Sequence, residues 1–413
     1  MDTIYITGGR PLAGTLAVQG SKNAVLPILA ATAAIPGRFA FTNCPAIRDV
    51  TVTCALLRGL GLRISEADGL VTADSRAAIH TAPDPVLAGK LRSSVLLLGA
   101  LLARLGRAEI PLPGGCALGL RPLDLHLNAL KTLGVRIRCE KERLLCLGRP
   151  TGGTVILPYP SVGATENLLL ASLGASGPVR LIGAAREPEI QDLAVFLRNC
   201  GAKLSGAGTP CISIEPAPLH GAVHSILPDR MEAATWLCAA AATGGALRLT
   251  GLQPDHLRPV LDTLRLAGCE IHESGAGVTL RAGPLRSPGT VVTGPYPGFP
   301  TDAQATVMAA LLQASGITLF EETVFSDRFR HVPALRAMGA QIETVGDLAR
   351  VRGVSALHGA EISATDLRGA AAMVIAALAA EGTSVIHDAW HLDRGYGNLI
   401  ERLRLLGAEA SER

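Results

Sequence analysis

Aromatic residues are scarce in this sequence: two Trp, four Tyr and seven Phe occur among 413 residues. A platform that stacks the bases of single-stranded nucleic acid needs more aromatic side chains than that. Charged residues are only 18% of the chain, and 38 basic against 35 acidic residues leave a net charge of +3. A protein that coats a polyanion would show clustered basic residues. We therefore expect no nucleic-acid partner.

Long uncharged apolar runs are also absent, since none reaches the roughly 18 residues that a membrane helix needs. The first residues, MDTIYITGG, show no basic region followed by an apolar one, which argues against a signal peptide. The expectation is a cytoplasmic protein with no membrane partner. A hydrophobic content of 48% excludes a disordered chain, and the length predicts two or three domains.

Nine cysteines are present, but no two of them form a CxxC pair. This argues against a disulfide framework and against structural zinc. The P-loop, the GxGxxG turn after a strand, HExxH and GxSxG are missing too. The ten histidines are scattered, and we interpret isolated ones such as His126 and His331 as structural or solvated.

A short pattern recurs six times along the chain: Leu, usually a basic residue, two further residues, Gly, any residue, a polar residue and an apolar one. Its glycines are about 70 residues apart, which is typical of a repeat architecture. They are Gly61, Gly134, Gly201, Gly268, Gly339 and Gly407. Each copy predicts a helix that ends at a glycine and leads directly into a strand.

Each repeat also contains a second helix, rich in Ala and Leu and apolar on nearly every face, which predicts burial. These helices are expected to begin near Lys22, Arg92, Glu166, Arg230, Asp302 and Arg368. Ordinary N-capping accounts for Thr165, Thr301 and Asp366. It does not account for four cations at helix starts, where positive charge is disfavoured: Lys22, Arg92, Arg230 and Arg368. They favour an anionic ligand.

One loop, PLPGGCALGLRPLDLH from Pro111, is rich in Gly and Pro, as functional lids often are. Cys116 is the one cysteine on such a loop. The nearby Arg121 would stabilise a thiolate, and Arg92 is a second candidate for that role. From the residues alone, a reactive thiol and an incidental one are equally acceptable.

Longer segments resemble the enolpyruvyl transferase family, and within it the enzymes that act on UDP-N-acetylglucosamine. These segments are GGRPLAGTLAVQGSKNAVLPILAA, LPGGCALGLRPLDLH, SVGATEN, AAREPEI, LPDRMEAATW, PGFPTDAQA, TVFSDRFRHVPAL, ATDLRGAAAMVIAALAAEGT and HLDRGYGNL. They run from about residue 6 to residue 407 in the family's order. The shikimate-phosphate branch shares the fold but lacks a PGGC loop.

The resemblance implies an α/β fold with two domains, an inside-out α/β barrel of six βαβαββ repeats, three per domain, around buried helices. One domain would comprise residues 1–21 and 229–413, the other residues 22–228 with the Cys116 loop, and the active site would lie in the cleft between them. The implied reaction transfers the enolpyruvyl group of phosphoenolpyruvate to the 3-hydroxyl of UDP-N-acetylglucosamine, through a tetrahedral ketal and with release of phosphate. It is the first committed step of peptidoglycan precursor synthesis and needs no metal or organic cofactor.

Matching the family's motifs assigns roles to residues of this sequence. Cys116 would act as general acid and as the site of covalent inhibition by fosfomycin, Asp302 as base, and Lys22 and Arg394 would join them as catalytic residues. Phosphoenolpyruvate would be held by Lys22, Asn23, Arg92, Arg121, Arg328, Arg368 and Arg394. The UDP-sugar would be held by Asn23, Arg92, Arg121, Pro122, Leu123, Asp124, Ser161, Val162, Gly163, Asp302 and Phe325. Asp366 and Leu367 match positions of the active-site network.

One departure from the family concerns the segment before SVGATEN, where some members carry Lys and this chain has Tyr159 and Pro160. A contact to the diphosphate would be missing there or supplied elsewhere. Two alternatives stay open: a paralogue that uses another uridine nucleotide, and an inactive paralogue that binds a UDP-sugar and regulates. The complete set of catalytic and cationic residues argues against the second. The expected assembly is a monomer or a weak homo-oligomer.

Overall fold

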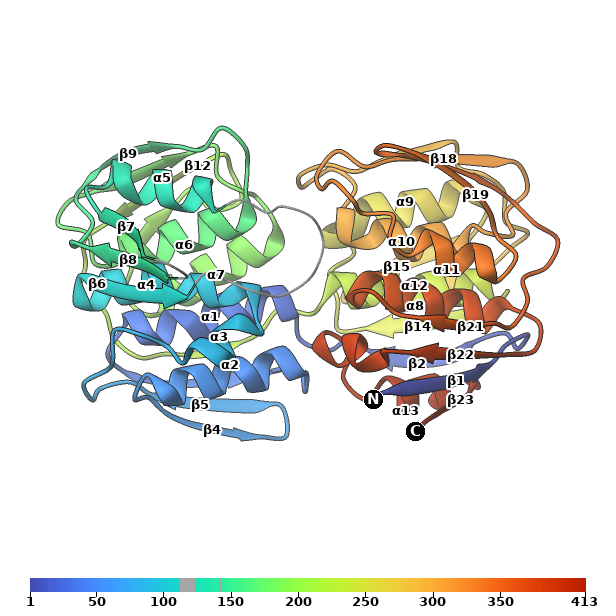
Figure 1. Cartoon of the computed structure of the whole chain (residues 1–413), viewed down its shortest axis with the longest axis horizontal. Helices are drawn as coiled ribbons and strands as arrows, with labels where there is room; N and C mark the ends of the chain where they lie inside the picture. Colours follow the sequence, from blue (N-terminus) through green and yellow to red (C-terminus); the bar gives the residue numbers. More distant parts are fainter. Residues whose placement is uncertain (112–122, 141–142) are drawn as a thin grey trace. The chain divides into compact units, whose positions relative to one another are not determined.

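The computed structural model describes residues 1–111, 123–140 and 143–413. Within these ranges the chain forms two compact units (Figure 1). Unit 1 combines Met1–Gln19 with Pro228–Arg413. Unit 2 runs from Gly20 to Leu227. Each unit has its own hydrophobic core.

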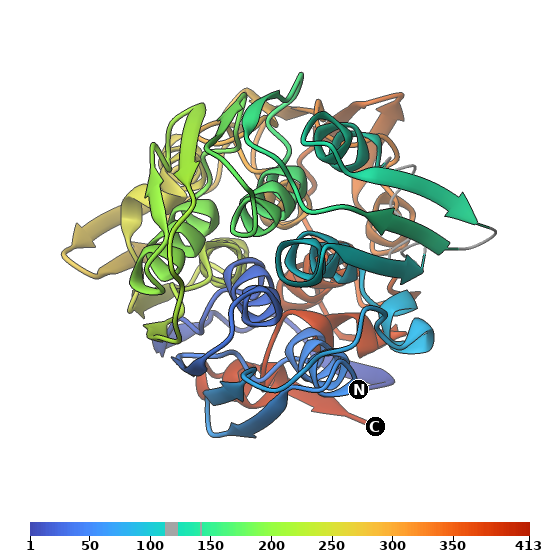
Figure 2. The ribbon, with the colours of Figure 1, turned by 90° about the vertical axis from the view of Figure 1, so that its left-hand side faces the viewer.

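Three long helices fill the centre of each unit. In unit 2 they are α1 (Lys22–Ala34), α4 (Leu96–Leu105) and α6 (Val162–Ser172), and in unit 1 α8 (Arg230–Ala242), α10 (Thr301–Ala310) and α12 (Leu367–Ala379). The helices of each trio pack against one another, and Figure 2 shows those of unit 2 surrounded by strands. In α12 every residue from Leu367 to Leu378 is buried. Burial on all faces explains why these helices are apolar all round.

An outer helix accompanies each inner one. These helices are α2 (Arg48–Gly59), α5 (Asp124–Thr132) and α7 (Pro188–Asn199) in unit 2, and α9 (Arg258–Leu266), α11 (Val332–Ala337) and α13 (Leu399–Leu405) in unit 1. All six pattern glycines follow these helices and have φ between 83° and 106°. Only glycine adopts this conformation at little cost, so the predicted glycine ends of the helices are confirmed. Short helical turns are α3 (Pro85–Gly89), η1 (Arg92–Val95), η2 (Pro254–Leu257) and η3 (Ala389–Arg394).

Three sheets enclose the helices of unit 2, with strand orders β13-β3-β5-β4, β11-β12-β10-β9 and β6-β8-β7. Their strands are β3 (Arg38–Thr42), β4 (Arg63–Ala67), β5 (Leu70–Asp74), β6 (Arg107–Pro111), β7 (Arg136–Glu140), β8 (Arg143–Leu147), β9 (Gly153–Ile156), β10 (Val179–Ile182), β11 (Lys203–Ser205), β12 (Cys211–Glu215) and β13 (Val223–Ser225). In the three-stranded sheet, Glu109 N donates to Thr81 O at 2.9 Å, so an irregular segment stands where the first strand of this repeat is expected.

Unit 1 has the sheets β15-β16-β14-β2, β17-β18-β20-β19 and β21-β22-β1-β23. Their strands are β1 (Thr3–Thr7), β2 (Ala13–Ala17), β14 (Ala246–Thr250), β15 (Glu270–Ser274), β16 (Gly277–Arg281), β17 (Thr290–Val292), β18 (Ile317–Glu321), β19 (Gln341–Val345), β20 (Leu348–Arg352), β21 (Glu361–Ser363), β22 (Thr383–His387) and β23 (Glu409–Glu412). β2 is parallel to β14, and β1 is antiparallel to β22 and β23. The N-terminal strands thus complete two sheets whose other strands come from the C-terminal half.

The repeat is clearest in β17–α10–β18–α11–β19–β20. There the first two strands are parallel, and β20 lies antiparallel between β18 and β19. The predicted fold of repeated βαβαββ units around buried helices in two compact units is confirmed, although the repeat with β6, β7 and β8 has an irregular segment in place of its first strand. Close helix packing depends on small residues: a Cβ at Gly99 of α4 would lie 2.2 Å from the carbonyl oxygen of Asn167 in α6.

Candidate functional site

The inner helix α1 places Lys22 at its first residue and Asn23 at its second. Lys22 Nζ lies 2.7 Å from Asp49 Oδ2 of α2, and the two side chains are 11% and 3% exposed. An ion pair this deeply buried fixes the position of the ammonium group. Asp49 therefore orients the cation that the family resemblance assigns to phosphoenolpyruvate.

In unit 1 three predicted site residues meet in one cluster. Asp302, in the first turn of α10, accepts hydrogen bonds from Arg328 Nη2 at 2.7 Å and from Arg368 Nη2 at 3.0 Å. Each guanidinium contacts a different carboxylate oxygen. The three residues come from segments far apart in the sequence, and the fold brings them within hydrogen-bond distance.

Arg368 is held from its other side by a buried hydroxyl pair. Tyr396 Oη is 3.4 Å from Arg368 Nη1 and 2.8 Å from Thr235 Oγ1 of α8. Burial lowers the pKa of Arg368, but Asp302, Tyr396 and Asp229 raise it more, so it is raised overall. The guanidinium is a permanent, oriented cation.

Arg328 is oriented by its own neighbours. Its guanidinium carbon lies 5.8 Å from the centre of the Phe325 ring, and Nη2 also donates to Thr301 O at 3.3 Å. The backbone N–H of Phe325 donates to Glu322 Oε1 at 3.1 Å, which fixes the loop carrying both residues. The predicted residues Phe325 and Arg328 therefore lie together.

His331 lies next to the start of α12: a Cβ added to Gly369 would come within 3.2 Å of His331 Cβ. Its side chain is buried, and Asp366 caps α12 by accepting from the N–H groups of Arg368 and Gly369 at 2.9 and 3.1 Å. Asp366 thus fixes the first turn of the helix that carries Arg368, and Leu367 is the first residue of that helix.

The start of α6 brings together the predicted nucleotide residues Ser161, Val162 and Gly163. Ser161 caps the helix, its Oγ accepting from Ala164 N at 3.3 Å. Val162 and Gly163 form the first turn, whose N–H groups have no acceptor within the helix. Such a turn favours a bound anion.

A buried amide–imidazole pair supports this turn. Asn167 donates from Nδ2 to His126 Nδ1 at 3.1 Å, because its Oδ1 accepts from Gly99 N at 2.7 Å. This arrangement places the imidazole proton on Nε2, which would lie 3.5 Å from a Cβ at Gly163. Arg92 begins the adjacent turn η1 and lowers the pKa of His126.

Several predictions about helix starts are wrong. α6 begins at Val162 rather than near Glu166, because the apolar residue and glycine of its first turn give no starting signal in the sequence. Thr165 accepts from Ala185 N instead of capping, and Thr301 donates to Glu322 Oε2. The cation at the start of α8, Arg230, lies over the Tyr296 ring at 5.5 Å.

The remaining predicted residues are placed as follows. Leu123 is the N-cap of α5 and Asp124 its first residue. Arg394 ends η3, and the Gln19 amide holds the segment after it, donating to Gly395 O at 2.7 Å and accepting from Gly397 N at 3.1 Å. Cys116, Arg121 and Pro122 lie outside the described residues.

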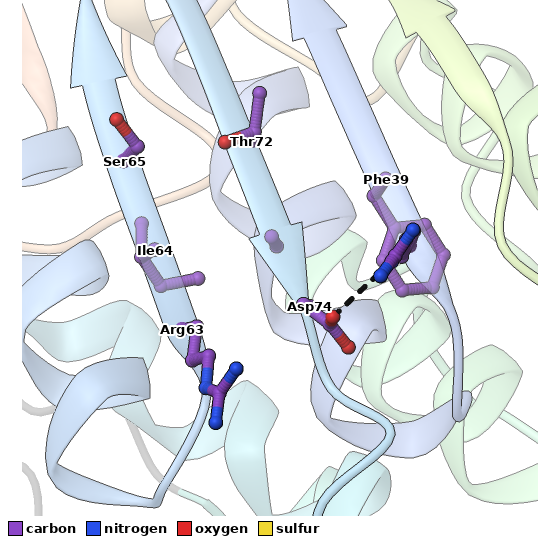
Figure 3. A pocket seen from close by; sticks show the side chains of 8 residues that line it. Phe39, Arg63, Ile64, Ser65, Thr72 and Asp74 are labelled. Carbon is purple, nitrogen blue, oxygen red and sulfur yellow. Dashed lines mark hydrogen bonds and ion pairs between the residues drawn. The ribbon is translucent and has the colours of Figure 1, made fainter.

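The described surface has hollows elsewhere. One of about 330 Å³ lies over β3, β4 and β5, where Arg38 Nε is 3.3 Å from Asp74 Oδ2 (Figure 3). Another of about 430 Å³ lies beside β19 and β20. Neither contains a predicted site residue, so shape alone does not locate the site.

Within residues 1–111, 123–140 and 143–413, no helix is long and apolar enough to cross a membrane, and no cluster of His, Cys, Asp and Glu could hold a metal ion.

The two buried histidines predict a pH dependence of stability. Burial lowers the pKa of both to about 4 from the ordinary 6.5; for His126, Arg92 lowers it further and Asp124 raises it, and for His331, Asp366 raises it and Arg328 lowers it. Because at these two sites only the unfolded chain gains a proton between pH 6.5 and 4, the contribution of the two histidines to the free energy of unfolding should fall as the pH falls through this window. Each histidine would contribute about 1.4 kcal/mol per pH unit. Urea titrations at several pH values measure the slope, and His126→Gln or His331→Gln should reduce it.

Sequence reasoning assigned no role to Asp49, Tyr396 and Asn167, which position predicted site residues. Tyr396 and Asn167 lie inside quoted segments, HLDRGYGNL and SVGATEN, so attention to polar residues in buried helices could have found them. Asp49 gives no such signal.

Comparison with known proteins bears on the whole chain. The family model of EPSP synthase (3-phosphoshikimate 1-carboxyvinyltransferase) matches residues 6–403. The UDP-N-acetylglucosamine 1-carboxyvinyltransferase of Granulibacter bethesdensis is 45% identical over 99% of both chains. The enzyme of that name from Desulfovibrio desulfuricans is 46% identical over 99% of this chain and 98% of its own.

Solved structures show the same architecture. The enolpyruvyl transferase NikO from Streptomyces tendae matches with a TM-score of 0.91 and 27% identity, over 99% of this chain and 98% of its own. EPSP synthase from Acinetobacter baumannii shares the fold, with a TM-score of 0.76 and 21% identity over the full length of both chains. By sequence and by fold, this chain belongs to the EPSP synthase family of enolpyruvyl transferases.

Proposed function

We propose that this chain transfers the enolpyruvyl group of phosphoenolpyruvate to the 3-hydroxyl of UDP-N-acetylglucosamine and releases phosphate, in the first committed step of peptidoglycan precursor synthesis. The observation that carries the proposal is the cluster in which Asp302 lies between the guanidinium groups of Arg328 and Arg368. The relatives named as UDP-N-acetylglucosamine 1-carboxyvinyltransferases, 43–46% identical over their full length, support this choice of acceptor.

Phosphoenolpyruvate carries a phosphate and a carboxylate, so its site needs several fixed cations. Arginine suits both groups because its planar fork can bind two oxygens at once. Arg328 and Arg368 are oriented by Phe325 and Tyr396, and Lys22 by Asp49. We assign these three cations, together with Asn23, Arg92, Arg121 and Arg394, to the phosphoenolpyruvate.

The reaction is an addition followed by an elimination. Asp302 takes the proton of the sugar 3-hydroxyl while the hydroxyl oxygen forms a bond to the substituted carbon of phosphoenolpyruvate. In the same step Cys116 gives a proton to the methylene carbon. The product of this step is a tetrahedral ketal that still carries phosphate. The methyl group then returns a proton to the Cys116 thiolate, the carbon–oxygen bond to phosphate breaks, and phosphate leaves with the proton held by Asp302. No oxidation or reduction occurs.

The nucleotide is assigned to the first turn of α6, where Ser161, Val162 and Gly163 favour the diphosphate. Further assigned contacts are Asn23, Arg92, Arg121, Pro122, Leu123, Asp124, Asp302 and Phe325. Since both units supply residues, we propose that they act on one pair of substrates. The substrates are water-soluble metabolites, and we assign the enzyme to the cytoplasm as a monomer or weak homo-oligomer.

The experiment measures phosphate release from phosphoenolpyruvate with and without UDP-N-acetylglucosamine. Release that requires the sugar nucleotide is the expected result. Release with another uridine nucleotide in its place would identify the paralogue with a different acceptor. Binding of the UDP-sugar without any release would identify a regulatory paralogue and contradict the proposal.

The loop thiol gives a second prediction. Fosfomycin should stop turnover and add one adduct, visible by intact mass, because a tuned thiolate opens its epoxide. Cys116→Asp should keep turnover, since a carboxyl can also carry the proton, and should form no adduct. Cys139→Asp, at an exposed cysteine of β7, is the matched control and should remain sensitive. Full turnover in Cys116→Ala would contradict the role as acid.

A further inference from the structure

The three side chains of the Asp302 cluster differ in how far they are exposed to solvent, and this difference matters for an anion that enters the site. The Asp302 side chain is 30% exposed, whereas those of Arg328 and Arg368 are 3% and 8% exposed. The carboxylate is therefore the most accessible member of the cluster. An anion arriving from solvent meets Asp302 before it can reach the Nη2 atoms that would bind it.

Each carboxylate oxygen accepts a guanidinium N–H in this arrangement, which leaves it one further lone-pair position. Oδ1 accepts from Arg328 at 2.7 Å and Oδ2 from Arg368 at 3.0 Å. A base must offer an oxygen to the hydroxyl whose proton it takes. While both ion pairs persist, the Asp302 carboxylate occupies the place at Arg328 and Arg368 where an anionic substrate group would bind.

We infer that Asp302 occupies the anion site of Arg328 and Arg368 in the free protein, and that an anionic group of phosphoenolpyruvate displaces it and thereby frees the base. This inference rests on the proposed function and adds a mode of regulation to it. The carboxylate is released from both ion pairs only when the group to be attacked is present. The rigid supports of the arginines, Tyr396 and Phe325, keep the guanidinium groups in place when the anions exchange.

The exchange makes a prediction opposite to that for an ordinary binding residue. Asp302→Asn keeps the size of the side chain but removes the competing anion, so it should bind phosphoenolpyruvate more tightly although it cannot act as base. We expect the Kd for phosphoenolpyruvate, measured by isothermal titration without nucleotide, to fall about tenfold, the effect of one charge-assisted hydrogen bond. The Kd for inorganic phosphate should also fall in Asp302→Asn.

Two controls separate exchange from a general effect of charge. Asp74 also lies between two arginines, Arg38 at 3.3 Å and Arg76 at 2.7 Å, but on an exposed sheet of unit 2. Asp74→Asn should leave the Kd unchanged. In about 1 M salt, where exposed charges interact over about 3 Å, the tightening in Asp302→Asn should persist, because the guanidinium groups are buried.

A measurement on the wild-type protein covers the case in which Asp302→Asn does not fold. Carbon-13 spectra of aspartate-labelled protein, with the Asp302 signal assigned by its loss in Asp302→Glu, should show that signal moving when phosphoenolpyruvate is added without nucleotide. An unchanged or higher Kd in folded Asp302→Asn, or an Asp302 signal that ignores saturating phosphoenolpyruvate, would overturn the inference. Turnover of the wild-type protein tests the proposed function separately, so the two can fail independently.

Discussion

Asp302→Asn is expected to lower kcat by about 10²- to 10⁴-fold, the usual contribution of general acid–base catalysis. The amide keeps the shape of the carboxylate and its place at the start of α10, but it cannot take the proton of the sugar hydroxyl. Steady-state phosphate release with both substrates saturating measures the effect. Because the same variant should bind phosphoenolpyruvate more tightly, kcat and affinity should move in opposite directions, which a merely structural defect would not produce.

Asp74→Asn is the matched control for turnover as well, since it removes a carboxylate from between two arginines in a hollow that no predicted site residue lines. Its kcat should equal that of the wild-type protein. A thermal melt of each variant checks that both remain folded. Near-normal kcat in Asp302→Asn would remove Asp302 from the role of base and transfer that role to another group.

Lys22→Met is expected to reduce turnover strongly and also to destabilise unit 2. The ammonium group lies 2.7 Å from the Asp49 carboxylate, and the Asp49 side chain is only 3% exposed. Removing one partner of a buried ion pair costs about 3–5 kcal/mol, because the other charge stays buried. Losing a charged contact to phosphate should lower kcat/KM about 10- to 100-fold or more. Urea unfolding and phosphate release measure the two effects.

The double variant Lys22→Met, Asp49→Leu separates these effects. Replacing a whole buried ion pair by apolar residues is often neutral for stability, so the free energy of unfolding should recover. Turnover should not recover, because the cation is still missing. Recovery of both would show that Lys22 acts only through the stability of α1 and α2.

The repeat could be predicted from sequence because its signals are local. The residue after each outer helix adopts positive φ, and each repeat therefore has glycine there, as at Gly61 and Gly407. The start of α6 could not be predicted, because Val162 and Gly163 belong to no capping pattern. Thr301 looked like a cap, but its hydroxyl found a partner in Glu322, which is remote in the sequence.

In the candidate site, too, some features could be predicted from the sequence and others could not. The resemblance to the family selected Asp302, Arg328 and Arg368, and the structure brings these three together. What they do to one another was not predictable, since a motif specifies residue types and not the ion pairs among them. The pairing of Lys22 with Asp49 was missed for this reason, as a contact between two helices that the strand β3 separates in the chain.

The N-terminal strands β1 and β2 pair with strands from the C-terminal half, and this pairing has a consequence for biosynthesis. The described residues of unit 2 all lie between Gly20 and Leu227, so its described strands leave the ribosome before those of the C-terminal half. β1 must instead wait for β22: Thr3 pairs with His387, 384 residues later. At about 5–20 residues per second this wait is roughly 20–80 s. Two strands of the nascent chain thus stay without their sheets while unit 2 can already fold, so chaperones can bind them during translation.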